Sequence, residues 1–215
     1  AISTVYAAYT LNDELLEYQR NFFAFFAKEA AKDPVKGYVF NSRGRKAIEY
    51  YFLKNMQHHG IEVHRLNKNV TLEGKTFQSN DSYIIPMNQR FYTKIKSMWE
   101  NMTEFQDSLF YDISTWTFPH AFNLQYAEAG TTSGLLGEKV HEPIFQKGGI
   151  IGGKATYAYV FENKELFSHN LIADLLRKGI YVRISKRPFS FNGNGNTQSF
   201  GYGTVVRETP NGLEV

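Results

Sequence analysis

The sequence predicts an α/β fold, a three-layer sandwich in which helices cover a mostly parallel sheet. The first observation behind it is an internal repeat, in which Tyr-Val-Phe is followed by a helical stretch and then by Gly-Ile. Tyr38 precedes Gly60 by 22 residues, and Tyr159 precedes Gly179 by 20. The second is the length of these crossovers, because strands joined by a helix in this way are usually parallel. We expect the two copies to share one sheet.

The first copy covers about 36–87. Its apolar residues recur at helical spacing, which indicates a helix with one apolar stripe. We expect Ser42 to cap the start of this helix and Gly60 to end it in a left-handed conformation. A strand over 61–66 and a hairpin with its tip at Glu73-Gly74-Lys75 follow. The stripe consists of Ala47, Ile48, Tyr51, Phe52 and Met56.

The second copy covers about 155–208. Its helix has an apolar stripe of the same kind, and Gly179 follows two basic residues that suit the end of a helix dipole. A strand over 180–184 comes next, and glycine and asparagine over 192–196 mark a hairpin tip. The stripe consists of Leu166, Leu171, Ile172, Leu175 and Leu176.

The remaining segments flank the copies. A helix is predicted over 13–32, and we expect residues 1–35 to lead in from a preceding domain, since the chain opens at Ala1 without a methionine. Residues 36–215 are predicted as one α/β domain, with an aromatic insert over 88–154 between the copies. This insert begins with a helix over 88–102 and ends in a glycine-rich loop or linker over 127–154.

Composition narrows the function classes. Apolar residues make up 42% of the chain and charged residues 21%, as in ordinary soluble globular proteins. The net charge is only +3, so we expect no nucleic-acid partner. No apolar stretch reaches the roughly 18–20 residues of a membrane-spanning helix, so no membrane span is expected. The absence of cysteine removes disulfides, thiolate metal sites and a cysteine nucleophile.

Histidine and acidic residues match a zinc-site spacing once, at His59-x-x-Glu62. We interpret this match as a helix end, because Gly60 turns the chain before Glu62 enters the next strand. No serine has the setting of a nucleophile elbow, and the glycine-rich stretches lack the spacing of a phosphate-binding loop. The sequence therefore predicts no catalytic, metal-binding or cofactor-binding residue in this chain.

The candidate binding site is an aromatic segment over 111–120. It combines aromatic rings with an acid, hydroxyls and a histidine, a mixture that lines ligand pockets and interfaces. The alternative is a patch of the core whose polar tips are bonded locally. The residues predicted for a binding or docking surface are Tyr111, Asp112, Trp116, Phe118 and His120.

Three motifs together resemble a known family. They are Gly-Ile-Glu-Val over 60–63, Ser-Tyr-Ile-Ile-Pro over 82–86 and Tyr-Asp-x-x-x-Trp-Thr over 111–117. They resemble the C-terminal part of certain bacterial zinc carboxypeptidases, in which a carboxypeptidase A-like catalytic domain comes first. The resemblance covers about 13–206 and implies a fold like that of class I glutamine amidotransferases or flavodoxin.

The resemblance implies a part of the metallopeptidase that has no activity of its own. The family's zinc ligands and general base belong to the upstream domain, so zinc is expected there, and no cofactor is expected in this chain. The amidotransferase-like fold normally carries a reactive cysteine, and a chain without cysteine has no glutaminase activity. The expected partner is the upstream peptidase domain of the same chain, and the expected location is periplasmic or secreted.

Three functions stay open at this point. The leading one is an accessory domain that packs on the peptidase domain or shapes access to its cleft. The second is a peptide- or carbohydrate-binding module that uses the aromatic surface over 111–120. The third is a self-contained hydrolase with an unrecognised site. Turnover of peptide by the chain with zinc separates the first from the third, and ligand screening with Trp116→Ala tests the second.

Overall fold

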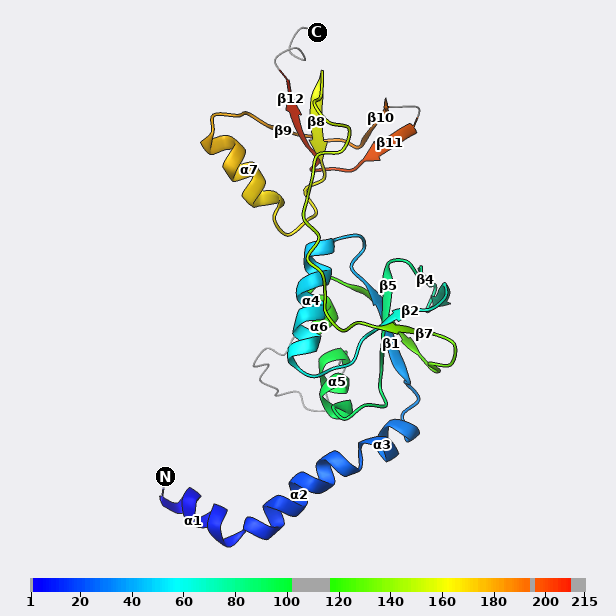
Figure 1. The fold of residues 1–215 in the computed structure, drawn as a ribbon, viewed down its shortest axis with the longest axis vertical. Coiled ribbons are helices and arrows are strands. Elements are labelled where there is room, and N and C mark those ends of the chain that lie inside the picture. Colours follow the sequence, from blue (N-terminus) through cyan, green and yellow to red (C-terminus); the bar gives the residue numbers. More distant parts are fainter. Residues whose placement is uncertain (1, 102–116, 194–195, 210–215) are drawn as a thin grey trace, which may run out of the picture. The chain divides into compact units, whose positions relative to one another are not determined.

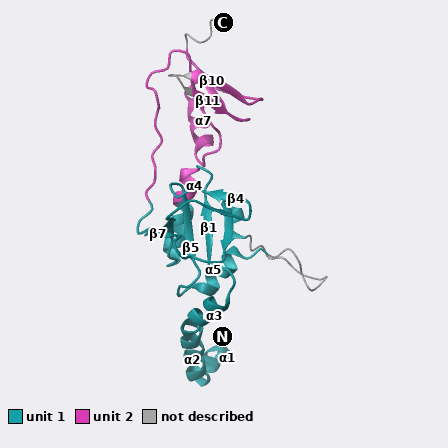
Figure 2. Cartoon of the chain, turned by 90° about the vertical axis from the view of Figure 1, so that its right-hand side faces the viewer, with its two compact units in different colours: residues 1–44, 51–143 teal, residues 45–50, 144–215 magenta. Residues whose placement is uncertain are grey.

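The computed structural model describes residues 2–101, 117–193 and 196–209. The chain divides into two compact units. Unit 1 consists of residues 1–44 and 51–143, and unit 2 of residues 45–50 and 144–215 (Figure 2). No described helix is long and apolar enough to cross a membrane.

The N-terminal region is helical but is not one helix. The predicted helix over 13–32 is observed as α2 (Asn12–Ala24) and α3 (Phe26–Lys32), with a break at Phe25, and α1 (Ile2–Thr10) precedes them. Neither α1 nor α2 has a buried residue. The apolar side chains of these two helices therefore lie largely at the surface.

Unit 1 contains a five-stranded sheet with the strand order β6-β1-β5-β2-β7 (Figure 1). Each neighbouring pair of its described strands is antiparallel. The bounds are β1 Gly37–Asn41, β2 His64–Leu66, β5 Ser82–Pro86, β6 Gln125–Ala129 and β7 Leu136–Lys139. β6 and β7 show that the stretch 127–154, predicted as a loop or linker, contains strand residues at the two edges of the sheet.

The predicted mostly parallel, amidotransferase- or flavodoxin-like sandwich is therefore wrong. The helical crossover from β1 to β2 does place these two strands in the same direction, as the sequence suggested. However, the last strand of the copy, β5, lies between them and is antiparallel to both. A crossover fixes the relative direction of the strands that it joins, but it does not make them neighbours.

Helices and a hairpin cover opposite faces of this sheet (Figure 1). The helices on one face are α4 (Lys46–His58), α5 (Tyr92–Trp99) and α6 (Phe118–Ala121), and the hairpin on the other is β3 (Val70–Leu72) with β4 (Lys75–Phe77). Successive side chains of β1 point to opposite faces of the sheet, as strand geometry requires. Tyr38 and Phe40 contact aromatic rings of the helix layer, whereas Val39 packs in a cluster with Phe77 of the hairpin.

Unit 2 repeats the element order of the first copy on a smaller scale. β8 (Ala158–Phe161), α7 (Ser168–Arg177) and β9 (Arg183–Ile184) are followed by the hairpin β10 (Phe189–Gly193) and β11 (Asn196–Phe200) and by β12 (Val205–Glu208). The sheet order β8-β12-β9 again places the last strand between the first two, antiparallel to both. The copies thus lie in separate sheets, and the prediction of one shared sheet is wrong.

Strand register makes the two copies equivalent residue by residue. Phe40 is opposite Tyr83 in the first copy, and Phe161 is opposite Val205 in the second. The partner of Tyr83 on β2 is Arg65, five residues after Gly60. The partner of Val205 on β9 is Ile184, likewise five residues after Gly179. Tyr38 and Phe40 therefore correspond to Tyr159 and Phe161.

The helix exits are equivalent as well. Gly60 and Gly179 have φ values of 68° and 70°, in the left-handed region that favours glycine. The N–H of each glycine donates to the carbonyl oxygen of the residue three positions earlier. The N–H of the isoleucine that follows donates to the carbonyl oxygen of the residue five positions before that isoleucine. The predicted left-handed end at Gly60 is confirmed, and Gly179, predicted to end the second helix, has the same conformation.

Candidate functional site

The aromatic segment predicted as a binding surface is described only at its end. Tyr111, Asp112 and Trp116 lie outside the described residues. Phe118 is half-buried in α6, where its ring centroid is 6.2 Å from that of Phe52 and 5.4 Å from that of Phe122. His120 is exposed two residues further on. The end of the segment thus contributes one residue to the core and one to the surface.

Aromatic side chains around Trp99 form a floor next to Tyr126. Trp99 stacks on Tyr38 with 4.8 Å between ring centroids, and it meets the rings of Phe40, Phe52 and Tyr126 at 5.5–6.0 Å. Trp99 is 1% exposed, and its indole N–H has no hydrogen-bond partner in the described part of the chain. Edge and stacked contacts of this kind add to the area that such rings bury, so the floor is rigid.

A polar rim surrounds Tyr126 at the outer edge of β6. Tyr126 Oη lies 3.3 Å from His120 Nε2. Lys75 Nζ donates to the Tyr126 carbonyl oxygen at 2.9 Å and lies over the ring, 5.6 Å from its centroid. Glu73 Oε1 accepts the backbone N–H of Glu128 at 2.9 Å. The hairpin tip thereby satisfies outward-facing backbone groups of the edge strand β6.

The rim side chains perturb one another electrostatically. Burial raises the pKa of Tyr126, and the carboxylates of Glu73 and Glu128 raise it further. Burial also raises the pKa of Glu128, with the charge of Glu73 as the next cause. Burial acts to raise the pKa of Glu73, but the hydrogen bonds from Glu128 N–H and from Lys75 outweigh it, so this pKa is lowered. A tyrosine with a raised pKa remains a neutral hydroxyl near neutral pH, so it is suited to hydrogen bonding rather than to proton abstraction.

Sequence reasoning found His120 but missed the rest of this rim. Tyr126, Glu73 and Lys75 come from segments that are separated along the chain, and no spacing connects them. The Glu73-Gly74-Lys75 turn was identified only as a hairpin tip, which is confirmed by the pairing of Leu72 with Lys75. What the sequence lacked was the position of that tip beside β6.

The His59-x-x-Glu62 spacing does not form a joint site. His59 Nδ1 lies 2.7 Å from Lys94 Nζ, and burial together with the charge of Lys94 lowers the pKa of His59. Glu62 is paired with Lys139 at 2.7 Å. Across the described residues, no group of three or more histidine or acidic side chains is close enough to hold a metal ion.

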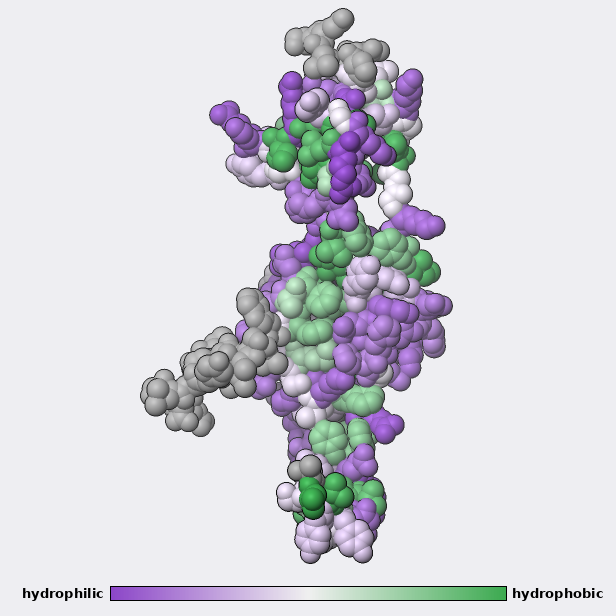
Figure 3. Space-filling view, turned by 90° about the vertical axis from the view of Figure 1, so that its left-hand side faces the viewer, coloured by the Kyte–Doolittle hydropathy of each residue, from purple (hydrophilic) through white to green (hydrophobic). Residues whose placement is uncertain are grey.

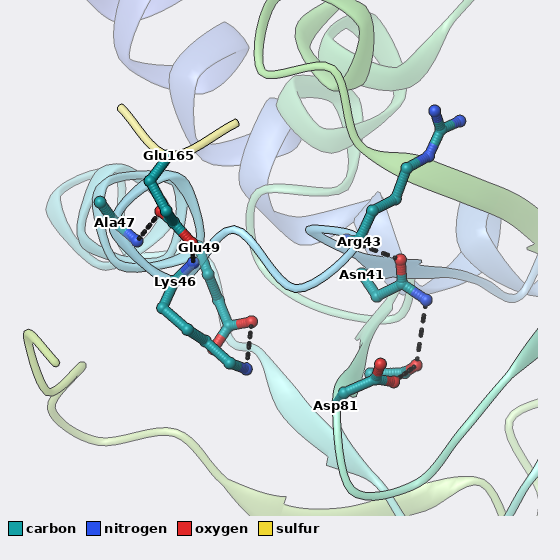
Figure 4. A network of polar contacts seen from close by, with 8 residues as sticks. Asn41, Arg43, Lys46, Ala47, Glu49, Asp81 and Glu165 are labelled. Carbon is teal, nitrogen blue, oxygen red and sulfur yellow. Dashed lines mark hydrogen bonds and ion pairs between the residues drawn. The ribbon is translucent and has the colours of Figure 1, made fainter. Parts of the chain in front are cut away.

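A second polar cluster lies at the carboxyl end of β1 (Figure 4). Asn41 Nδ2 donates to Ser82 Oγ at 3.4 Å, and Ser82 Oγ donates to Asp81 at 2.9 Å. Asn41 Oδ1 accepts the backbone N–H of Arg43, whose φ is 55°. Asn41 and Ser82 are buried, so these bonds satisfy polar groups that would otherwise be costly inside the fold. The cluster shapes the turn after β1.

The start of α4, in unit 2, is capped by an acid rather than by Ser42. The Glu165 carboxylate accepts the backbone N–H groups of Lys46 at 3.0 Å and of Ala47 at 3.4 Å (Figure 4). A negative charge at this end is favoured by the helix dipole. The prediction of Ser42 as the N-cap is wrong because α4 begins at Lys46, so Ser42 lies in the preceding turn.

The comparisons with known proteins yield no relative. No protein-family model matches the chain, and neither the curated proteins nor the solved structures contain a match.

Proposed function

We propose that this chain is a non-catalytic accessory module that packs on the catalytic domain of a zinc carboxypeptidase-like protein of the periplasm or of secreted material. The observation that carries the proposal is the exposed apolar surface of the N-terminal helices. The motifs described above supply the class of the partner. Two of these motifs occupy structural positions, since 82–86 is the central strand β5 and 60–63 follows the end of α4.

The N-terminal helices expose many large apolar side chains to solvent. Ile2 is 88% exposed, Tyr9 81% and Tyr18 70%. Figure 3 shows this apolar surface on the N-terminal helices. Many exposed apolar side chains gathered on neighbouring helices support an interaction site there. The other large apolar residues exposed on these helices are Val5, Tyr6, Leu11, Leu15, Leu16, Phe22 and Phe25.

The exposed surface of these helices contains a pocket. It lies between α2, α3 and α5 and has a volume of about 310 Å³. The walls are mostly aromatic, as in interface pockets that receive an anchoring side chain. The side chains that form it include Tyr18, Phe22, Phe25, Phe26 and Tyr92.

Asp33 attaches the base of these helices to the body of unit 1. Its carboxylate accepts from the Tyr92 hydroxyl at 2.7 Å, from Lys96 Nζ at 2.8 Å and from Val35 N–H at 2.9 Å. Lys36 Nζ donates to three carbonyl groups at the end of α3. A docking surface held in this way loses little freedom on binding, which favours affinity.

The test is association with the catalytic domain. The gene that encodes this chain is first sequenced in full. The peptidase domain that it is expected to encode is then produced and mixed with the chain, and formation of a complex is measured by sedimentation velocity. We expect a complex that Leu16→Asp with Phe22→Asp weakens at least roughly tenfold, because both changes place charges in an apolar interface. Tyr181→Asp, an equally conspicuous exposed aromatic residue in unit 2, is the matched control and should leave the affinity unchanged.

Activity of the chain provides the second arm. The purified chain is incubated with zinc and with peptides that have free C-termini, and released amino acids are measured. We expect no turnover. Carboxypeptidase turnover by the chain alone, or a reading frame without a peptidase, would overturn the accessory function.

A second candidate function is peptide or carbohydrate binding at the aromatic surface. The observation that favours it is the rim of His120, Tyr126 and Lys75 above an aromatic floor. The test is to titrate peptides and carbohydrates by calorimetry into the unmodified chain and into the variants Trp116→Ala and His120→Ala, which should bind more weakly. Absence of ligand heat from the unmodified chain counts against this function.

A further inference from the structure

The two copies differ at both edges of their sheets, and the difference at the β1 side is the clearer one, since β2 pairs with β7 over few residues and the equivalent β9 is only two residues long. In the first copy β1 has an antiparallel neighbour on each side, β5 and β6, and all five of its residues are buried. In the second copy the equivalent strand β8 pairs with β12, and no further strand pairs with it among the described residues. The four residues of β8 are only half-buried. The edge of β8 that corresponds to the β6 side of β1 is therefore open.

The helix of the second copy is also less covered than that of the first. Counting back from the equivalent glycines, Phe52 of α4 corresponds to Leu171 of α7. Phe52 is 0% exposed and is covered by Trp99, Phe118 and Phe122, with ring centroids at 5.3–6.2 Å. Leu171 is 47% exposed.

Open edges are normally blocked in proteins, and the first copy shows how. Lys75 binds the outward carbonyl of Tyr126, and Glu73 binds the outward N–H of Glu128, so the outer edge of β6 is closed. No comparable side-chain bonds to the backbone of β8 occur on its open side among the described residues. β8 therefore presents unpaired backbone groups that an extended segment can bind.

β6 specifies the side chains that such a segment needs. Its Tyr126 is opposite Phe40 and its Glu128 is opposite Tyr38, and both side chains lie on the helix side of the sheet. In the first copy the Tyr126 ring meets Trp99 of α5. Transferred to the second copy, an aromatic residue is opposite Phe161, on the same side of the sheet as the Phe161 side chain. The residue two positions later is opposite Tyr159.

Charge complementarity determines that second position. The residue on β12 opposite Tyr159 is Arg207, where the first copy has the neutral Ile85. Arg207 has no ion pair within the described residues. Residues 144–209 carry nine basic and four acidic side chains, so the surroundings are positive. The acid and Arg207 would lie in one row with Tyr159 between them, about 10 Å apart by strand spacing, so the positive charge of Arg207 and of these surroundings favours an acid there without a direct contact.

We propose that the open edge of β8 binds an extended peptide of a partner protein, antiparallel to β8. The peptide carries an aromatic residue and, two positions later, an acidic one. Backbone hydrogen bonds supply sequence-independent affinity, and the two side chains supply specificity. This site is independent of the N-terminal docking surface and does not rest on the accessory function.

The probe is a labelled ten-residue peptide with the sequence of 122–131, Phe-Asn-Leu-Gln-Tyr-Ala-Glu-Ala-Gly-Thr. Its binding to the full chain is measured by fluorescence anisotropy. We expect saturable binding, which weakens roughly fivefold or more when the glutamate of the peptide becomes lysine or when the chain carries Arg207→Glu. Lys186→Glu makes the same change of charge on an exposed residue outside β8, β12 and α7, and should leave binding unchanged.

Reversing the charge on the peptide and on the chain together separates a loss of charge attraction from a folding defect. The lysine peptide should bind Arg207→Glu better than the glutamate peptide does, which a misfolded variant could not produce. The β8 amides that face away from β12 should exchange their hydrogens fast in the free chain, and this exchange should slow when the peptide is bound. Three results would each overturn the proposal: no binding by the folded chain, equal binding of both peptides by both forms, or β8 already protected by pairing between copies of the chain.

Discussion

The two repeat copies have the same backbone but different interiors. β1 is buried along its whole length, and Phe52 and Met56 of α4 are both 0% exposed. In the second copy β8 is half-buried, and Leu171 and Leu176 of α7 are 47% and 51% exposed. The difference arises after the copies end, because the first is followed by α5, α6 and β6, which close its helix side and its sheet edge. An apolar stripe therefore predicts a helix, but not that the stripe has a cover.

The strongest test of this comparison truncates equivalent side chains. Phe52→Ala should lower the free energy of unfolding of unit 1 by about 3–5 kcal/mol, since it leaves a cavity in a closed aromatic cluster. Leu171→Ala should cost about 1 kcal/mol or less, because half of that side chain is already in water. Urea unfolding and hydrogen exchange, read separately for α4 and α7, measure both. Equal losses would show that the second copy is as closed as the first.

The next test compares an enclosed acid with an exposed one. Asp33→Asn should destabilise unit 1 by about 2 kcal/mol at neutral pH, since hydrogen bonds to a charged acceptor are lost. Asp174→Asn, which removes an exposed pair with Arg177 on α7, should cost about 0.5 kcal/mol or less. Both values come from urea unfolding. A loss at Asp33 as small as that at Asp174 would contradict the anchoring role.

The pH dependence of the Asp33 contribution has a definite sign. Burial acts to raise the pKa of Asp33, but the hydrogen bonds from Lys96, Tyr92 and Val35 N–H outweigh it and lower the pKa from 3.8 to about 2. The stabilisation is therefore complete above about pH 4 and is lost as the pH falls toward 2. The acid limb of the stability curve should be shallower in Asp33→Asn. An unchanged limb would show that other carboxylates dominate it.

The helix exits give a matched pair of glycines. Both substitutions to alanine force a left-handed φ, at a cost of about 1 kcal/mol. In Gly60→Ala the new Cβ also meets Phe91 Cε2 at 2.9 Å, whereas at Gly179 it meets no atom within 4 Å. Gly60→Ala should therefore cost about 1 kcal/mol more than Gly179→Ala in thermal or urea unfolding. Equal costs would mean that the Phe91 ring moves aside freely.

The smallest stability effect is expected at the closed sheet edge. Lys75→Ala removes an exposed side chain, so its cost should be about 0.5 kcal/mol. It also uncovers the Tyr126 carbonyl, so sedimentation should show more self-association than for Arg177→Ala, a control on an exposed pair of α7. Unchanged association would mean that Lys75 does not protect the edge.

The sequence predicted the elements of both copies better than their arrangement. The equivalence of Gly60 and Gly179 was visible from spacing, and both glycines have the expected left-handed conformation. The hairpin at Glu73-Gly74-Lys75 was predicted from its turn residues. These features depend on neighbours within a few residues. The insertion of β5 between β1 and β2 depends on a contact across about 40 residues, and no local pattern records it.

The candidate site shows the same limit. His120 was selected because its segment combines aromatic rings with an acid, hydroxyls and a histidine, but Tyr126 gains its role from Lys75 and Glu73, which lie on a separate hairpin. Likewise, the helix predicted over 13–32 is observed as α2 and α3, and α2 has no buried residue. Hydrophobic periodicity shows which side of a helix avoids water, and it does not identify what covers that side.

By itself, the sequence determined that this protein contains a strand–helix–strand unit followed by a hairpin twice, because local spacing, turn residues and helix ends are encoded close to where they act. The tertiary structure alone decided that neighbouring strands are antiparallel, that the copies occupy separate sheets and that only the first is closed. These properties arise from which distant segments pair and pack, and the free energy of that pairing depends on surfaces that a linear pattern does not contain.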